Sequence, residues 1–165
     1  MNIERVVATQ EIEYLRRQYA KATDLIGLAD KASIKLGRDI YERIFTPDVA
    51  IRTTSGGEEN YTATGPEAWV DVVADALAKY RATQHLIGTQ LVEFETFELN
   101  NDSSIKRGSA RMESYLQAWH EEADSVWLFL GTYTDLVRYE SGLGWRIYDM
   151  TLDEVAGETR ALGQL

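Results

Sequence analysis

The sequence predicts an α+β fold, in which a curved antiparallel sheet carries about three helices on its concave face. Three observations lead to this prediction. Apolar residues follow a helical period through most of the first half of the 165-residue chain. The second half changes to the alternation of β-strands, and clusters of turn residues divide it into four long runs. Helices and strands that are segregated along the chain in this way are typical of α+β folds.

The first half is expected to contain three helices and one short strand. Apolar residues spaced by three and four predict a helix over residues 9–26, which Thr9 can cap. A second helix is expected over residues 31–45, because Pro47 follows it. Residues 49–53 are typical of a short strand. Pro66 is expected in the first turn of a third helix that ends near Tyr80.

The second half is expected to form a meander of four long strands. In its second run, residues with odd numbers such as Glu113 and Tyr115 share one face, whereas Met112 and Leu116 share the other. Polar and glycine-rich segments end each run and favour tight turns. The four expected strands cover residues 86–99, 106–120, 126–139 and 145–152.

Length and composition exclude several classes of protein. A chain of 165 residues is expected to form a single domain, residues 1–165. The absence of cysteine excludes a disulfide scaffold, a thiolate nucleophile and an iron–sulfur cluster. The net charge of −10 argues against binding to nucleic acid or to anionic membranes.

The sequence also leads to expectations about the location of the protein and about its cofactors. Because no apolar run is long enough to cross a bilayer and the N-terminus begins with a charged segment, a cytoplasmic protein is expected. The chain has no glycine-rich nucleotide motif, and its two histidines, far apart in sequence, do not make a metal site. No cofactor and no metal are therefore expected.

Six short segments carry a resemblance to a known family. They follow one another in family order and span nearly the whole chain. The sequence resembles the SnoaL-like branch of the nuclear transport factor two-like superfamily, which includes scytalone dehydratase, hexachlorocyclohexane dehydrochlorinase and relatives of ketosteroid isomerase. The resemblance implies a cone-shaped α+β fold with an internal pocket. The segments are Tyr19–Asp24, Phe45–Ile51, Gly65–Glu67, Thr83–Thr89, Gly131–Asp135 and Gly144–Ile147.

The same resemblance implies a catalytic pair. In the dehydratase and dehydrochlorinase branch, an aspartate that ends the first helix meets a histidine that begins the strand after the third helix. The matching residues here are Asp24 and His85. A histidine whose far nitrogen is held by a carboxylate can act as a general base. On an ideal helix, however, Asp24 lies roughly 170° from the centre of the apolar stripe, so periodicity alone places it in solvent.

Further residues are candidates for a supporting role. Asp30 is a reserve carboxylate, because the segment after Asp24 is longer than the family pattern. His120 is a reserve candidate for a second proton donor, although its place beside a turn favours an exposed position. Arg146 could bind a substrate anion, but as part of an alternating strand it is more simply a solvent-facing residue. Other candidates for substrate binding are Tyr19, Tyr41, Thr89, Tyr115 and Trp119.

Two functions from different classes remain open at this point. The first is a small cofactor-free lyase or isomerase that takes a proton from a hydrophobic small molecule, leading to elimination, dehydration or isomerisation. The second is a non-catalytic small-molecule-binding protein or the small subunit of an aromatic-ring hydroxylating dioxygenase. A homodimer is expected in either case, because helices on one face cannot cover the whole surface of the long strands.

Overall fold

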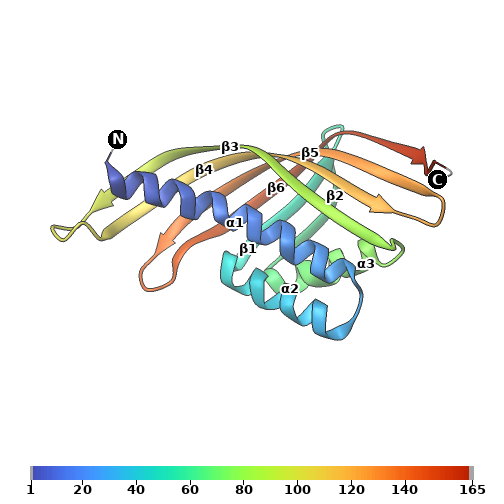
Figure 1. Cartoon of the computed structure of the whole chain (residues 1–165). Coiled ribbons are helices and arrows are strands. Elements are labelled where there is room, and N and C mark those ends of the chain that lie inside the picture. The colour runs from blue at the N-terminus through green and yellow to red at the C-terminus, as the bar shows by residue number, and fades with distance from the viewer. Residues whose placement is uncertain (1, 164–165) are drawn as a thin grey trace.

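The computed structural model describes residues 2–163, in which three helices pack on one side of a curved six-stranded sheet (Figure 1). The predicted fold class is confirmed. The start of α1 and the end of β6 lie at opposite ends of the molecule. The helices are α1 (Ile3–Gly27), α2 (Lys31–Ile44) and α3 (Pro66–Leu77). The strands are β1 (Phe45–Ser55), β2 (Glu58–Thr64), β3 (Ala82–Leu99), β4 (Ile105–Glu121), β5 (Ser125–Glu140) and β6 (Gly144–Ala161).

The sheet has the strand order β2-β1-β6-β5-β4-β3. The last four strands form the predicted antiparallel meander. The strand β1 then joins β6 in a parallel pair, so the sheet is mixed, and β2 forms a hairpin with β1 at the edge. This order places β1 and β3 on opposite sides of the concave face, with three strands between them.

Several bounds differ from the sequence prediction and one strand is additional. The strand β1 begins at Phe45, four residues before the expected start, and β6 extends to Ala161, nine residues past its expected end. The helix α1 begins at Ile3 and is capped by Asn2, whose side chain accepts a hydrogen bond from the backbone N–H of Arg5. Thr9 therefore lies inside the helix, where its hydroxyl bonds to the carbonyl of Arg5. The strand β2 was not predicted, because most of its residues are polar and exposed, and it shows no alternation of burial.

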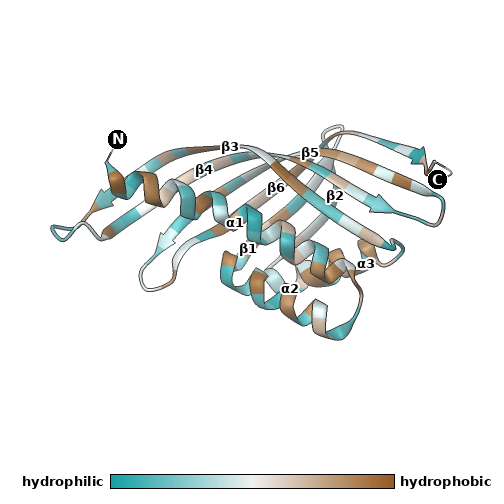
Figure 2. Ribbon diagram, in the orientation of Figure 1, coloured by the Kyte–Doolittle hydropathy of each residue, from teal (hydrophilic) through white to brown (hydrophobic). Residues whose placement is uncertain are grey.

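Hydrophobic and hydrophilic residues follow one another along the long strands (Figure 2), and on β4 and β5 buried residues alternate with more exposed ones. On β4, Met112, Ser114 and Leu116 are buried under the helices, whereas Tyr115 and Trp119 point to the outer face. The predicted division of this strand into two faces is confirmed. The concave face and the helices together bury the hydrophobic core of the protein.

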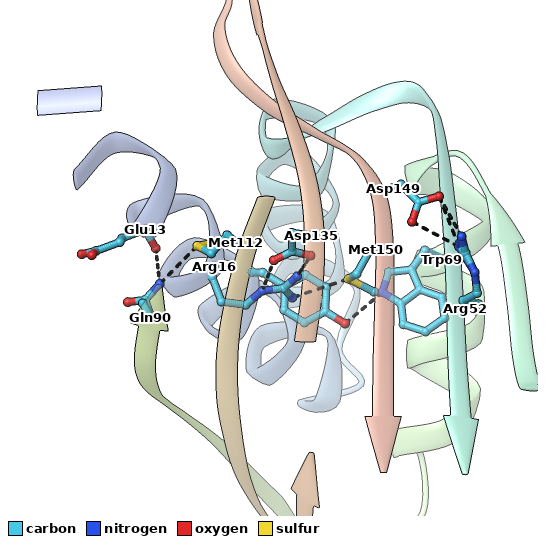
Figure 3. A network of polar contacts seen from close by, with 10 residues as sticks. Glu13, Arg16, Arg52, Trp69, Gln90, Met112, Asp135, Asp149 and Met150 are labelled. Carbon is cyan, nitrogen blue, oxygen red and sulfur yellow. Dashed lines mark hydrogen bonds and ion pairs between the residues drawn. The ribbon is translucent and has the colours of Figure 1, made fainter. Parts of the chain in front are cut away.

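A fully buried ion pair ties α1 to the middle of the sheet (Figure 3). Arg16 on α1 donates two hydrogen bonds to the carboxylate of Asp135 on β5, and its Nε lies 3.0 Å from Oδ2. The guanidinium also lies 3.7 Å from the centre of the Tyr133 ring and 4.4 Å from that of Tyr19. Burial raises the pKa of Asp135, so the two parallel hydrogen bonds offset only part of the cost of burying both charges. They nevertheless fix the position of α1 over the sheet.

Candidate active site

A cavity of about 320 Å³ lies between the helices and the concave face of the sheet. Side chains of α1, α3 and all six strands line it, and most of them are apolar or aromatic. Tyr61 and Lys79 belong to the lining but are largely exposed, so they mark the mouth of the cavity. A concave, largely apolar cavity with a few polar groups is the usual form of a small-molecule site.

The structure brings Asp24 and His85 together at this cavity. The Nδ1 atom of His85 lies 2.7 Å from Oδ1 of Asp24. The same carboxylate accepts hydrogen bonds from the Thr83 hydroxyl at 3.1 Å and from the backbone N–H of His85 at 3.2 Å. The side chain of His85 is 7% exposed and that of Asp24 is 22% exposed. His85 lines the cavity, whereas Asp24 supports it from behind.

The position of Asp24 departs from the helical-wheel expectation for a local reason. Near its C-terminal end, α1 contacts the beginning of β3 in addition to the core. Gly27 permits this contact, because a Cβ atom at this position would lie 2.9 Å from the hydroxyl oxygen of Thr83 and 3.2 Å from Leu77. The polar side of the helix is therefore covered here by a strand, and Asp24 is only partly solvated.

His120 lies inside the same cavity, and the expectation of an exposed histidine beside a turn is wrong. It is 4% exposed, and its ring centre lies 5.7 Å from that of His85. The rings of Tyr80 and Trp127 each lie 4.8 Å from it. Burial, followed by the proximity of His85, lowers the pKa of His120 to about 4. His120 is therefore neutral near pH 7.

Tyrosine hydroxyls supply further polar groups on or near the cavity. Tyr19 and Tyr133 line it, and the Tyr19 hydroxyl accepts a hydrogen bond from Nε1 of Trp69 at 3.1 Å. Tyr41 lies behind the lining, with its hydroxyl 2.6 Å from that of Thr23. Burial raises the pKa of Tyr41 and of Tyr133 well above the usual phenol value, so both stay protonated.

The other sequence candidates lie outside the cavity. Tyr115 and Trp119 are on the outer face of the sheet, 56% and 44% exposed, because their odd positions on β4 point away from the helices. Thr89 is exposed at an irregular step in the pairing of β3 with β4. Arg146 is half-buried, and its Nη1 lies 3.5 Å from the carbonyl of Phe45. None of these residues is in the cavity lining.

Asp30, the reserve carboxylate, has a structural position. It caps the N-terminus of α2, and its side chain accepts hydrogen bonds from the backbone N–H groups of Ala32 and Ser33 at 3.0 Å each. Hydrogen bonding from Ser33 lowers the pKa of Asp30. The longer segment after Asp24 thus serves to begin α2, and the carboxylate that meets His85 is Asp24.

Several residues of the site had no role assigned from the sequence. Thr83 carried a detectable signal, since it lies two positions before His85 on one strand and therefore on the same face. Tyr80 and Trp127 carried none, because any aromatic residue at these positions is first expected to pack in the core. Within residues 2–163, no three His, Cys, Asp or Glu side chains gather in a group that could hold a metal ion.

A comparison with protein families matches residues 35–151 to the SnoaL-like domain. The chain belongs to the SnoaL-like family. The resemblance inferred from the sequence is therefore confirmed. A comparison of this SnoaL-like protein with curated proteins gave no significant match. Among its described residues, no helix is both long enough and apolar enough to span a membrane.

Solved structures of other proteins share the fold at low sequence identity. A protein of Novosphingobium aromaticivorans assigned as a scytalone dehydratase aligns with a TM-score of 0.69 and 17% identity, over 100% of this chain and 94% of the other. A hexachlorocyclohexane dehydrochlorinase of Novosphingobium barchaimii gives 0.69 and 15%, over 100% and 97%. A protein of Novosphingobium aromaticivorans assigned as the beta subunit of an aromatic-ring-hydroxylating dioxygenase gives 0.63 and 14%, over 92% of each chain.

Proposed function

We propose that this SnoaL-like protein is a small cofactor-free enzyme, in which His85 removes a proton from a carbon atom of a hydrophobic small molecule. The observation that carries the proposal is the 2.7 Å contact between His85 Nδ1 and Asp24 Oδ1 at the wall of an apolar cavity. A histidine in a cavity that also bonds to a carboxylate is the arrangement expected of a general base.

The hydrogen bond to Asp24 supports a defined role for each nitrogen of His85. When neutral, the imidazole donates its Nδ1–H to the carboxylate and keeps a lone pair on Nε2. The Nε2 atom then accepts the substrate proton, and the carboxylate stabilises the imidazolium that forms. A positioned base of this kind contributes typically about 10²- to 10⁴-fold in rate.

The rest of the cavity supports a reaction in which negative charge develops on the ligand. The Tyr133 phenol, which stays protonated, and the Tyr19 phenol can donate hydrogen bonds to a ligand oxygen. The proposed reaction is an elimination, a dehydration or an isomerisation. The structural relatives support this range, since a dehydrochlorinase carries out an elimination and a dehydratase removes water.

A binding protein or a dioxygenase subunit is the second candidate function. The likeness to a protein assigned as a dioxygenase beta subunit favours it. Such a protein would use the cavity without proton transfer, and the contact between Asp24 and His85 would then only stabilise the fold. This candidate therefore predicts ligand binding without turnover.

We also propose that the protein is a homodimer of single-domain subunits. Large apolar side chains lie together on the outer face of β3, β4 and β5, and we call this set the outer patch. Trp119 is paired with Leu128, and Leu86 and Leu130 flank Gln117 on the same face. Exposed large apolar side chains that gather on one face are typical of a protein interface. The outer patch consists of Leu86, Leu91, Tyr115, Trp119, Leu128 and Leu130.

The proposed activity can be tested without knowledge of the natural substrate. The test compound is 2-indanone, an apolar bicyclic ketone with acidic C–H groups next to its carbonyl. Proton NMR in deuterium oxide measures how fast these hydrogens exchange, and thermal shift measures binding. We expect the wild-type protein to accelerate exchange and His85→Ala to lose the acceleration while keeping its fold. If 2-indanone stabilises the wild-type protein but does not exchange faster, the binding function is favoured instead.

A further inference from the structure

The second histidine of the cavity makes a hydrogen bond through one of its two ring nitrogens. The Nδ1 atom of His120 lies 3.3 Å from the backbone carbonyl oxygen of Trp127. Because a carbonyl oxygen only accepts hydrogen bonds, this contact is a hydrogen bond in the tautomer with the hydrogen on Nδ1, which we assign to His120. A neutral imidazole has one N–H group, so the Nε2 atom of His120 carries a lone pair and is a hydrogen-bond acceptor.

We propose that Nε2 of His120 accepts a hydrogen bond from the ligand, and that the protein selects neutral ring compounds that carry an O–H or N–H donor. This inference rests on the proposed function in one respect, that the ligand occupies the same cavity. It also assigns His120 a role opposite to that of a proton donor. His120 is thus a specificity-determining residue, and His85 remains the base.

The surroundings of His120 hold its ring in place and leave Nε2 without a partner. The rings of Tyr80 and Trp127 pack against the imidazole, with both ring centres 4.8 Å away. Within residues 2–163, no side chain or backbone group forms a hydrogen bond to Nε2. Nε2 is not among the buried side-chain atoms without a partner, so it is open to the cavity, and a ligand that covers it without supplying a donor would leave it unpaired. A donor on the ligand would bond to Nε2, and an apolar ligand would not.

The charge state of the ring supports acceptance over donation. Burial and the neighbouring His85 lower the pKa of His120 to about 4, so the ring stays neutral at pH 7. A neutral ring whose only N–H group faces Trp127 has no second hydrogen to donate. The ring centres of His120 and His85 are 5.7 Å apart, so one small ring can contact both side chains.

The charges around the cavity favour a neutral donor over an anion. Asp24 lies behind His85, and Glu154 is part of the lining. The one basic side chain in the lining is Lys79, which lies at the mouth and forms an ion pair with Glu122 at 3.3 Å. An anion near His120 would therefore meet acceptors and a carboxylate, and the nearby cation, Lys79, is already paired with Glu122.

Two pairs of small compounds test the inference by isothermal titration calorimetry at pH 7. One pair is 4-tert-butylphenol and 4-tert-butylanisole, and the other is indole and 1-methylindole. Each pair differs by a methyl group that replaces the donor hydrogen, and the two pairs distinguish O–H from N–H donors. We expect the wild-type protein to bind at least one donor compound about tenfold more tightly than its methylated partner, as one added hydrogen bond predicts.

Two substitutions at the same position separate the two ring nitrogens. His120→Asn keeps an amide N–H near the place of Nδ1 and deletes the acceptor, so the preference should fall to within about twofold. His120→Gln reaches the place of Nε2 with an amide oxygen and should keep most of the preference. Thermal unfolding checks that both variants are folded. In addition, nitrogen-15 NMR of the ligand-free wild-type protein should show His120 protonated on Nδ1.

Several results would overturn the inference. They are a hydrogen on Nε2 of His120, the absence of a preference in both pairs, the absence of binding by all four compounds, or an unchanged preference in His120→Asn. The donor preference can be measured whether or not the protein catalyses the proposed reaction. His85→Ala should keep the donor preference while losing exchange of 2-indanone. A preserved preference in a wild-type protein that does not catalyse exchange would refute the reaction and leave the role of His120 intact.

Discussion

The carboxylate of Asp24 accepts three hydrogen bonds, and all three come from residues near the start of β3. Thr83 and the backbone N–H of His85 bind the carboxylate from fixed positions, so its third bond can hold the His85 ring in one orientation. A carboxylate that is itself restrained orients an imidazole more firmly than a mobile one. At the scale of single residues, this arrangement makes Thr83 a positioning residue.

Replacing Thr83 with valine should slow exchange of 2-indanone roughly fivefold, because one hydrogen bond to a partly exposed carboxylate contributes about 1 kcal/mol to positioning. The shape of the side chain is nearly kept, so the fold should persist. Thr96→Val on the same strand is the matched control, since Thr96 lies outside the cavity. Equal rates in Thr83→Val and the control would show that Thr83 does not position Asp24.

The burial of His120 should also make stability depend on pH. Its pKa is about 6.5 in an unfolded chain and about 4 in the folded protein. Between these values, only the unfolded chain takes up the proton, so the stability from neutral His120 is present above pH 6.5 and is lost as the pH falls toward 4. Urea unfolding at pH 7 and pH 5 should show the wild-type protein losing about 2 kcal/mol more than His120→Gln. His85 and Lys79 face the same cavity and are unchanged in this comparison. Equal losses in both proteins would contradict a neutral, buried His120.

At the scale of elements, α1 is the part that assembles the site. Its C-terminal end supplies Asp24, its middle supplies Tyr19, and Arg16 anchors it to β5. The rings of Tyr19 and Tyr133 separate the ion pair from the cavity, so the anchor lies directly behind part of the lining. Removing the anchor should therefore affect both stability and the shape of the cavity.

Arg16→Met should lower the free energy of unfolding by about 3–5 kcal/mol, because it leaves the Asp135 carboxylate buried without a partner. Urea denaturation measures this change. Arg17→Met is the neighbouring control, since Arg17 is half exposed and its bonds to Glu13 and Gln90 are on the surface. The control should cost less than about 1 kcal/mol. A loss below about 1 kcal/mol in Arg16→Met would show that the ion pair does not anchor the helix.

The sequence predicted elements wherever burial produced a regular period. The alternation on β4 was sufficient to place Met112 inside and Tyr115 outside. Exposed β2 has no such period, and it could not be recognised. Helical periodicity assigned Asp24 to solvent because it describes the face that packs on the core. It contains no information about a strand that crosses the opposite side of the helix.

At the scale of the whole molecule, the pairing of strands far apart in the chain could not be predicted from the sequence. The parallel contact of β1 with β6 joins segments about a hundred residues apart, and no local pattern encodes it. The cavity depends on this contact, because β1 and β2 close the side of the concave face opposite His85. The burial of His120 likewise depends on β5. In the sequence His120 lies next to a turn, but pairing with β5 packs the Trp127 ring against it.

The proposed dimer is tested through the outer patch. Trp119→Glu places a charge in an apolar surface, so we expect light scattering at micromolar concentration to show a monomer, whereas the wild-type protein is a dimer. Leu143→Glu is a control at an exposed apolar residue in the turn between β5 and β6. It should remain a dimer. A wild-type monomer, or dissociation in the control as well, would contradict an interface at the outer patch.

The central claim is that Asp24 and His85 act as one catalytic unit, and a double-mutant cycle on the exchange of 2-indanone tests it most directly. Asp24→Asn and His85→Ala should each lower the rate by at least about tenfold, and the double variant should be no slower than His85→Ala within about twofold. The reason is that the carboxylate acts only through the imidazole. If the two effects multiply, if His85→Ala is as active as the wild-type protein, or if Asp24→Asn is silent while Asp30→Asn is damaging, the claim is wrong.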